Sequence, residues 1–174
     1  MRTRYPLPLV ALHWATALAV VVAYVSGGEP DEAETTLEFL IGQLHVGAGL
    51  AVFALVLLRL PLRALLGAPA AEPGPRWQQR AAHAAHFALY ALMLAVPLGG
   101  WAALGHEVSS FSLAGFALPL PDGNALWARA LGQSHEFLAN AFIWLAGLHA
   151  VAALVHHYVL GDGVLKRMSL RRAD

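Results

Sequence analysis

Residues 134–157 read SHEFLANAFIWLAGLHAVAALVHH. As a helix, with a rise of about 1.5 Å per residue, this run can cross a hydrocarbon layer about 30 Å thick. It nevertheless carries four histidines: His135, His149, His156 and His157. Ionisable side chains inside a membrane helix are costly and usually serve a function. The stretch therefore predicts a membrane helix whose imidazoles bind something.

The composition of the whole chain indicates an integral membrane protein. The 174 residues are 58% hydrophobic and only 13% charged, with a mean hydropathy of +0.57. A soluble domain is typically about one quarter charged. The chain has no cysteine, which excludes disulfides, iron–sulfur clusters and thiolate-bound haem. It also contains no P-loop, no dinucleotide-binding glycine pattern and no sign of a nucleic-acid partner.

Four segments are apolar enough over a sufficient length to span a bilayer. They are residues 7–26, 41–62, 81–104 and 134–160. We therefore expect an all-α, integral membrane four-helix bundle that forms a single domain over residues 1–174. Pro97 lies inside the third span and is expected to kink or loosen it. A cleaved signal peptide is the alternative for the first span, but that span contains His13 and lacks an A-x-A cleavage pattern.

The basic residues are distributed very unevenly between the two sides of the predicted bundle. Ten of the eleven lysines and arginines fall in the two terminal segments and around the connection between spans two and three. The first connection has five acidic residues and no basic one, and the third has only Arg129. Because basic loops stay on the cytoplasmic side, we expect both termini to be cytoplasmic in a multi-pass protein of the bacterial inner membrane.

With this topology, the histidines pair by depth. His135 and His149 are fourteen residues apart, which corresponds to about 21 Å along one face of a helix. His45 should match the depth of His135 near the outside, and His13 that of His149 near the inside. Two imidazoles, one on each side of an iron, hold a six-coordinate haem b suited to electron transfer. The pattern therefore predicts two bis-histidine haem b groups, one in each leaflet.

Two other interpretations of these histidines remain open. A single histidine within the membrane is often an interhelical hydrogen-bonding residue. A zinc or copper site is the other possibility, although such a site usually gathers three or four ligands at one depth. Arg59 lies fourteen residues after His45, and it is expected either to pair with a propionate of the inner haem or to anchor the helix at the cytoplasmic surface.

A second group of polar residues gathers at the cytoplasmic ends of spans three and four. Its members are Arg80, His83, His86, His156 and His157. A quinone needs hydrogen bonds to its carbonyls and a source of protons near neutral pH, which histidine supplies. We interpret this group as a quinone-binding cluster, in which His86 and His157, with Arg80 nearby, are the favoured contacts. Histidines that simply face lipid headgroups are the alternative.

Several stretches of the sequence resemble one known family. They are LHW at residues 12–14, LHVGAGL at 44–50, HAAHFALY at 83–90, and SHEFLANAFIWLAGLHAVAALVHHYV at 134–159. Over essentially its whole length the chain resembles the bacterial dihaem cytochrome b561 family. The resemblance implies that His13 and His149 ligate one haem, and His45 and His135 the other.

The resemblance also implies electron exchange with ubiquinone, and the family includes a superoxide oxidase. We therefore expect an oxidoreductase that oxidises periplasmic superoxide to O₂ and reduces ubiquinone. It would need no residue for covalent or general-base catalysis and no obligate protein partner. One alternative is a cytochrome b subunit that relays electrons between quinol and a partner dehydrogenase or reductase. Another is a non-redox membrane transporter.

Overall fold

The computed structural model describes residues 4–27, 35–69 and 74–170. Its long helices are α1 (Leu7–Val25), α2 (Thr36–Leu66), α3 (Arg76–Glu107) and α5 (His135–Tyr158). The shorter elements are strands β1 (Phe111–Leu113) and β2 (Phe116–Leu118), helix α4 (Leu126–Gln133) and the 3₁₀ turn η1 (Leu165–Met168). Some charged residues on which the predicted orientation depends lie outside the described residues. They are Arg2, Arg171, Arg172 and most acidic residues of the first connection.

The expected all-α bundle is confirmed at the level of its four long helices. By length and composition, Leu7–Val25, Thr36–Leu66, Arg76–Glu107 and Leu126–Tyr158 are each apolar enough to cross a membrane. The last range covers α4 and α5, which meet at Ser134. Many large apolar side chains on these helices are exposed, including Trp144 at 77%. Contact with lipid explains such a surface, because soluble proteins rarely expose so large an apolar area to water.

The second and third helices extend beyond the predicted spans. Helix α2 begins earlier because polar residues cap it. The Thr35 side chain accepts a hydrogen bond from the Glu38 backbone N–H, and the Glu38 carboxylate accepts one from the Thr35 N–H. This capping box starts α2 five residues before the apolar run. Gly67, at φ +74°, ends the helix. Helix α3 remains continuous through Pro97.

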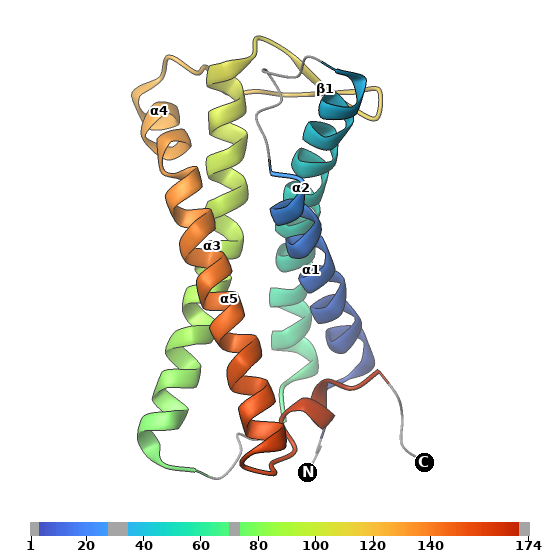
Figure 1. Ribbon diagram of the computed structural model, residues 1–174, viewed down its shortest axis with the longest axis vertical. Helices are drawn as coiled ribbons and strands as arrows, with labels where there is room; N and C mark the ends of the chain where they lie inside the picture. The colour runs from blue at the N-terminus through green and yellow to red at the C-terminus, as the bar shows by residue number, and fades with distance from the viewer. Residues whose placement is uncertain (1–3, 28–34, 70–73, 171–174) are drawn as a thin grey trace.

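The helices pack as two pairs. Helix α1 lies along α2, α3 packs against α4 and α5, and a contact between α2 and α3 joins the pairs (Figure 1). A small apolar core at this junction contains Val52 and Val56 from α2, Leu89 and Met93 from α3, and Phe142 from α5. In Figure 1, the start of α1 and η1 lie at one end of the bundle and β1 at the other. We call these the terminal end and the hairpin end.

The third connection contains more structure than the loop expected from the sequence. Strands β1 and β2 form an antiparallel hairpin in which Ser112 pairs with Ala117. The two turn residues, Ala114 and Gly115, both have positive φ, as a tight two-residue hairpin requires. Gln43 on α2 donates to the Ser112 carbonyl at 2.6 Å, and Trp101 on α3 donates to the Pro119 carbonyl at 2.7 Å. The hairpin is thus tied to both helix pairs.

Candidate haem and quinone sites

One pair of imidazoles faces each other near the hairpin end. His45 on α2 and His135 at the start of α5 have ring centroids 6.1 Å apart and planes at 83°. His45 Nδ1 lies 2.8 Å from the Ala23 carbonyl, and His135 Nδ1 lies 2.9 Å from the Val96 carbonyl. A carbonyl only accepts, so each Nδ1 carries the hydrogen. Each Nε2 is therefore left with a free lone pair, the form of histidine that binds metal.

A second imidazole pair lies towards the terminal end. His13 on α1 and His149 on α5 have ring centroids 6.4 Å apart and planes at 81°. An imidazole nitrogen binds a transition metal at about 2 Å, so two rings on opposite sides of one iron have centroids roughly 6 Å apart. Both pairs match this separation. His86 on α3 is also close, with its ring centroid 5.4 Å from that of His149, a contact that depth alone did not predict.

Arg59 is the buried cation of the second pair. Its side chain is 7% exposed, and its NH1 lies 3.1 Å from His13 Nδ1. A guanidinium only donates, so Nδ1 of His13 accepts here and a neutral ring would carry its hydrogen on Nε2. A metal-binding Nε2 on His13 would require Arg59 to bond elsewhere. Among the described residues, Arg59 Nε has no hydrogen-bond partner. A buried, incompletely paired cation of this kind calls for an anionic group beside it.

The backbone leaves space beside His45. A Cβ at Gly49, which lies one turn after His45 on the same face of α2, would meet no atom within 4 Å. Within the described ranges, no three His, Asp or Glu side chains converge on a metal-sized site, so the zinc or copper interpretation gains no support. Paired imidazoles, open space and a buried cation fit haem b, with its flat ring and anionic propionates.

Comparisons with known proteins agree with this chemistry. Residues 4–169 match the family model described as prokaryotic cytochrome b561. The chain belongs to the prokaryotic cytochrome b561 family. It is 35% identical to cytochrome b561 homolog 1 of Escherichia coli (strain K12), over 97% of this chain and 98% of the relative. It is 32% identical to the probable superoxide oxidase CybB of Yersinia pestis, over 97% of both chains.

A third relative is the cytochrome b562 of Cereibacter sphaeroides. The two are 34% identical over 91% of this chain and 90% of the relative. Membership of the prokaryotic cytochrome b561 family implies haem b and electron transfer in a membrane.

The predicted quinone cluster lies at the terminal end. Arg80 and His83 are exposed on the first turns of α3, and His86 reaches His149. His156 and His157 are partly buried on the last turn of α5. His157 Nδ1 is buried and has no hydrogen-bond partner among the described residues. A quinone carbonyl accepts hydrogen bonds but cannot donate them. His157 would therefore have to carry a hydrogen on Nδ1 for this nitrogen to bind a quinone.

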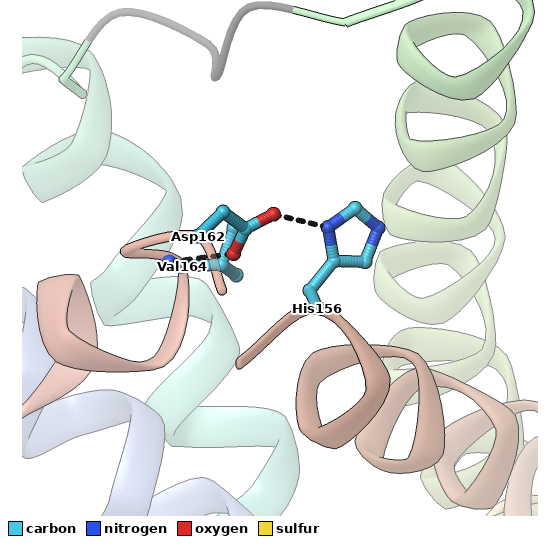
Figure 2. A network of polar contacts seen from close by, with 3 residues as sticks. All are labelled: His156, Asp162 and Val164. Atoms are coloured by element: carbon cyan, nitrogen blue, oxygen red, sulfur yellow. Dashed lines mark hydrogen bonds and ion pairs between the residues drawn. The ribbon is translucent and has the colours of Figure 1, made fainter. Parts of the chain in front are cut away.

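One candidate functional residue was missed in the sequence. Asp162, in the turn after α5, is bonded to the ring of His156 (Figure 2). The flanking residues Gly161 and Gly163 made this aspartate look like an ordinary turn residue. Its separation of six residues from His156 was the only available signal.

Proposed function

We propose that this chain carries electrons across the bacterial inner membrane, from superoxide at the hairpin end to ubiquinone at the terminal end. The observation that carries the proposal is the presence of two imidazole pairs with centroid separations of 6.1 and 6.4 Å. Both use α5, and His135 and His149 lie at different levels of that helix. A single-site metal protein would not need two such pairs.

His45 and His135 would hold one haem b, and His13 and His149 the other. When bound between these imidazoles, the two haems would supply one-electron carriers suited to electron transfer rather than to O₂ binding. The protein holds the rings in place by hydrogen bonds from Nδ1 of His45 and His135 to backbone carbonyls. Arg59 would leave His13 Nδ1 and pair with a propionate of the haem held by His13 and His149. Its side chain is buried, which supports a propionate partner rather than an anchor at the lipid headgroups.

The hairpin end would face the periplasm. The connections at this end, residues 27–38 and 105–136, contain one arginine, whereas the other ten basic residues belong in sequence to the terminal segments, the last part of α2, the α2–α3 connection and the start of α3. Two superoxide ions would each give up one electron near His45 and His135 and leave as O₂. This donor is supported by the 32% identity to a relative named probable superoxide oxidase.

Ubiquinone would be reduced at the terminal end. Its carbonyl oxygens would accept hydrogen bonds from His86 and His157, with Arg80, His83 and His156 completing the cluster. Two electrons from two superoxide ions and two protons from the cytoplasmic side convert one quinone to one quinol. The rings of His86 and His149 lie 5.4 Å apart, which would put the quinone beside the haem held by His149.

Two measurements test the proposal. A reduced-minus-oxidised spectrum with haem quantified per chain should show haem b at two groups per polypeptide. Purified protein mixed with a superoxide source and a ubiquinone analogue should then form quinol faster than the uncatalysed reaction. A colourless protein would remove the haem assignment, whereas a coloured protein without superoxide-driven quinol formation would remove only the reaction.

A second candidate function is electron relay to or from a partner protein. The connections at the hairpin end carry eight acidic residues against one arginine. Such a surface repels an anion such as superoxide and attracts a basic redox protein. Co-purification with a stable periplasmic or membrane-bound partner, together with slow reaction with superoxide, would favour this function.

A further inference from the structure

A carboxylate and an imidazole meet just beyond the end of α5. Asp162 Oδ2 contacts His156 Nδ1, and Asp162 Oδ1 accepts the Val164 backbone N–H at 3.1 Å. The Asp162 backbone N–H in turn donates to the His156 carbonyl at 3.1 Å. The carboxylate is therefore held on both of its oxygens (Figure 2). The His156 and Asp162 side chains remain 33% and 22% exposed, so water at the terminal end can reach the pair.

We propose that Asp162 is the positioning residue that makes His156 the proton donor of the quinone site. This inference rests on the proposed function, because it assumes that a quinone is reduced at the terminal end. It adds to that function a route by which protons enter.

The contact determines which nitrogen of His156 exchanges protons. The carboxylate accepts the hydrogen on Nδ1, so uptake and release must occur at Nε2. Figure 2 shows this second nitrogen pointing away from Asp162, towards the side on which α3 runs. Helix α3 packs against α5 and carries His83 and His86 of the quinone cluster. The geometry thus directs the exchangeable proton of His156 towards the cluster.

The Asp162 carboxylate accepts the hydrogen on Nδ1 and so fixes the His156 ring with Nε2 open to proton exchange. Partial burial by itself raises the pKa of the Asp162 carboxyl, but the His156 and Val164 hydrogen bonds and the charges of His156 and Arg167 lower that pKa below its usual value. The carboxylate therefore stays ionised at neutral pH. Among the described residues, His156 on α5 and Arg167 on η1 are the charged or titratable groups that face it.

The step balances as a proton transfer coupled to quinone reduction. The Nε2–H bond of His156 breaks as an O–H bond forms on a carbonyl oxygen of the quinone, while the electrons come from superoxide. His156 then regains a proton from water at the terminal end. Asp162 keeps its charge throughout and is not itself consumed or protonated.

The inner step can be measured without superoxide. The haems are reduced with stoichiometric dithionite, the protein is mixed with ubiquinone-1 in a stopped-flow instrument, and haem reoxidation is followed from pH 6 to 9. Asp162→Asn should be roughly tenfold slower at pH 8, since general acid catalysis typically contributes a hundredfold or more. Its dependence on pH should also differ from that of the wild type, because Nδ1 of His156 loses its carboxylate acceptor. Asp162→Glu, which keeps the carboxylate, should recover most of the rate.

Asp122→Asn is the matched control. Asp122 accepts the backbone N–H of Asn124 two residues further on, as Asp162 does with Val164, but it lies at the hairpin end. This variant should match the wild type in rate and pH profile. Haem content should be the same in all variants and the thermal unfolding midpoint should change by no more than about 2 °C, which separates a proton defect from misfolding.

A second readout does not involve the reaction. In ¹⁵N-histidine NMR spectra, with His156→Gln used for assignment, the His156 ring should carry hydrogen on Nδ1 in the wild type and a mixture of tautomers in Asp162→Asn. If the wild type is not reoxidised by ubiquinone-1, the proposed quinone site is wrong and this inference falls with it. If the wild type reacts but Asp162→Asn has the same rate, pH profile and tautomer, only the role of Asp162 is overturned.

Discussion

His13 on α1 and His149 on α5 lie at opposite ends of the sequence, yet their ring centroids are 6.4 Å apart. His45 and His135 repeat this relationship near the hairpin end at 6.1 Å. Because both pairs draw one ring from α5, this single helix connects the two candidate haem positions. The two pairs share no residue, so each candidate haem site can be removed by mutation without changing the ligands of the other.

We expect His149→Ala and His135→Ala each to lower haem content from two groups to one per chain. Each change removes one ligand of one pair and leaves the other pair intact. Haem per polypeptide, measured by the pyridine haemochrome method, checks this. His106→Ala is the control because His106 is exposed at the hairpin end. If a variant that combines His149→Ala with His135→Ala still binds both haems, the ligand assignment is wrong.

Replacing Arg59 should change the potential of one haem only. Arg59→Met removes a buried positive charge near the His13–His149 pair. That charge favours the reduced iron, so its loss should lower the potential of that haem by about 50 mV, given Coulomb energies in a partly shielded site. Spectroelectrochemical titration measures both potentials. Arg59→Lys should shift the potential less, and identical potentials in all three proteins would exclude an electrostatic role.

Filling the space beside His45 should exclude a haem without unfolding the protein. Gly49 lies four residues after His45, and a Cβ there meets no atom within 4 Å. We expect Gly49→Leu to lower haem content towards one group per chain while the helix content measured by circular dichroism is unchanged. Ala51→Leu, at an exposed position of α2, is the control. Normal haem loading of Gly49→Leu would place the macrocycle elsewhere.

Ionic strength should distinguish the candidate electron donors. The acidic connections at the hairpin end repel superoxide, and salt screens this repulsion over a Debye length of about 10 Å at 0.1 M. Haem reduction by superoxide should therefore become faster, by roughly twofold to threefold, between 10 and 200 mM salt. Reduction by a basic redox protein should become slower over the same range. A superoxide rate that falls with salt would show that local positive charge dominates the approach.

The contact between Asp162 and His156 should contribute to stability only above acidic pH. Because the carboxyl pKa is lowered on folding, its contribution is present above the ordinary value of about 3.9 and is lost as pH falls through the lowered value. The difference in unfolding midpoint between the wild type and Asp162→Asn should be about 2 °C or less at pH 6, as for other exposed ion pairs. Thermal unfolding in detergent should show that difference shrinking and then vanishing as the pH falls below the ordinary carboxyl pKa and through the lowered one.

The sequence alone was sufficient to predict the four helices, since a membrane helix needs only a long apolar run that supplies its own backbone hydrogen bonds. It also predicted which histidines share a depth, because depth follows from the rise per residue. The role of these histidines as haem ligands stays a prediction. The early start of α2 was missed because the capping box at Thr35 lies outside the apolar run.

Only the tertiary structure decided which side chains meet across the bundle. The contact of Arg59 with His13, the approach of His86 to His149, and the pairing of Asp162 with His156 all depend on how helices are rotated and how a turn folds back. Hydropathy and spacing record position along a helix axis but carry little information on rotation or on loop paths. The hairpin was missed for the same reason: its strands are short, and its place is determined by hydrogen bonds to distant helices.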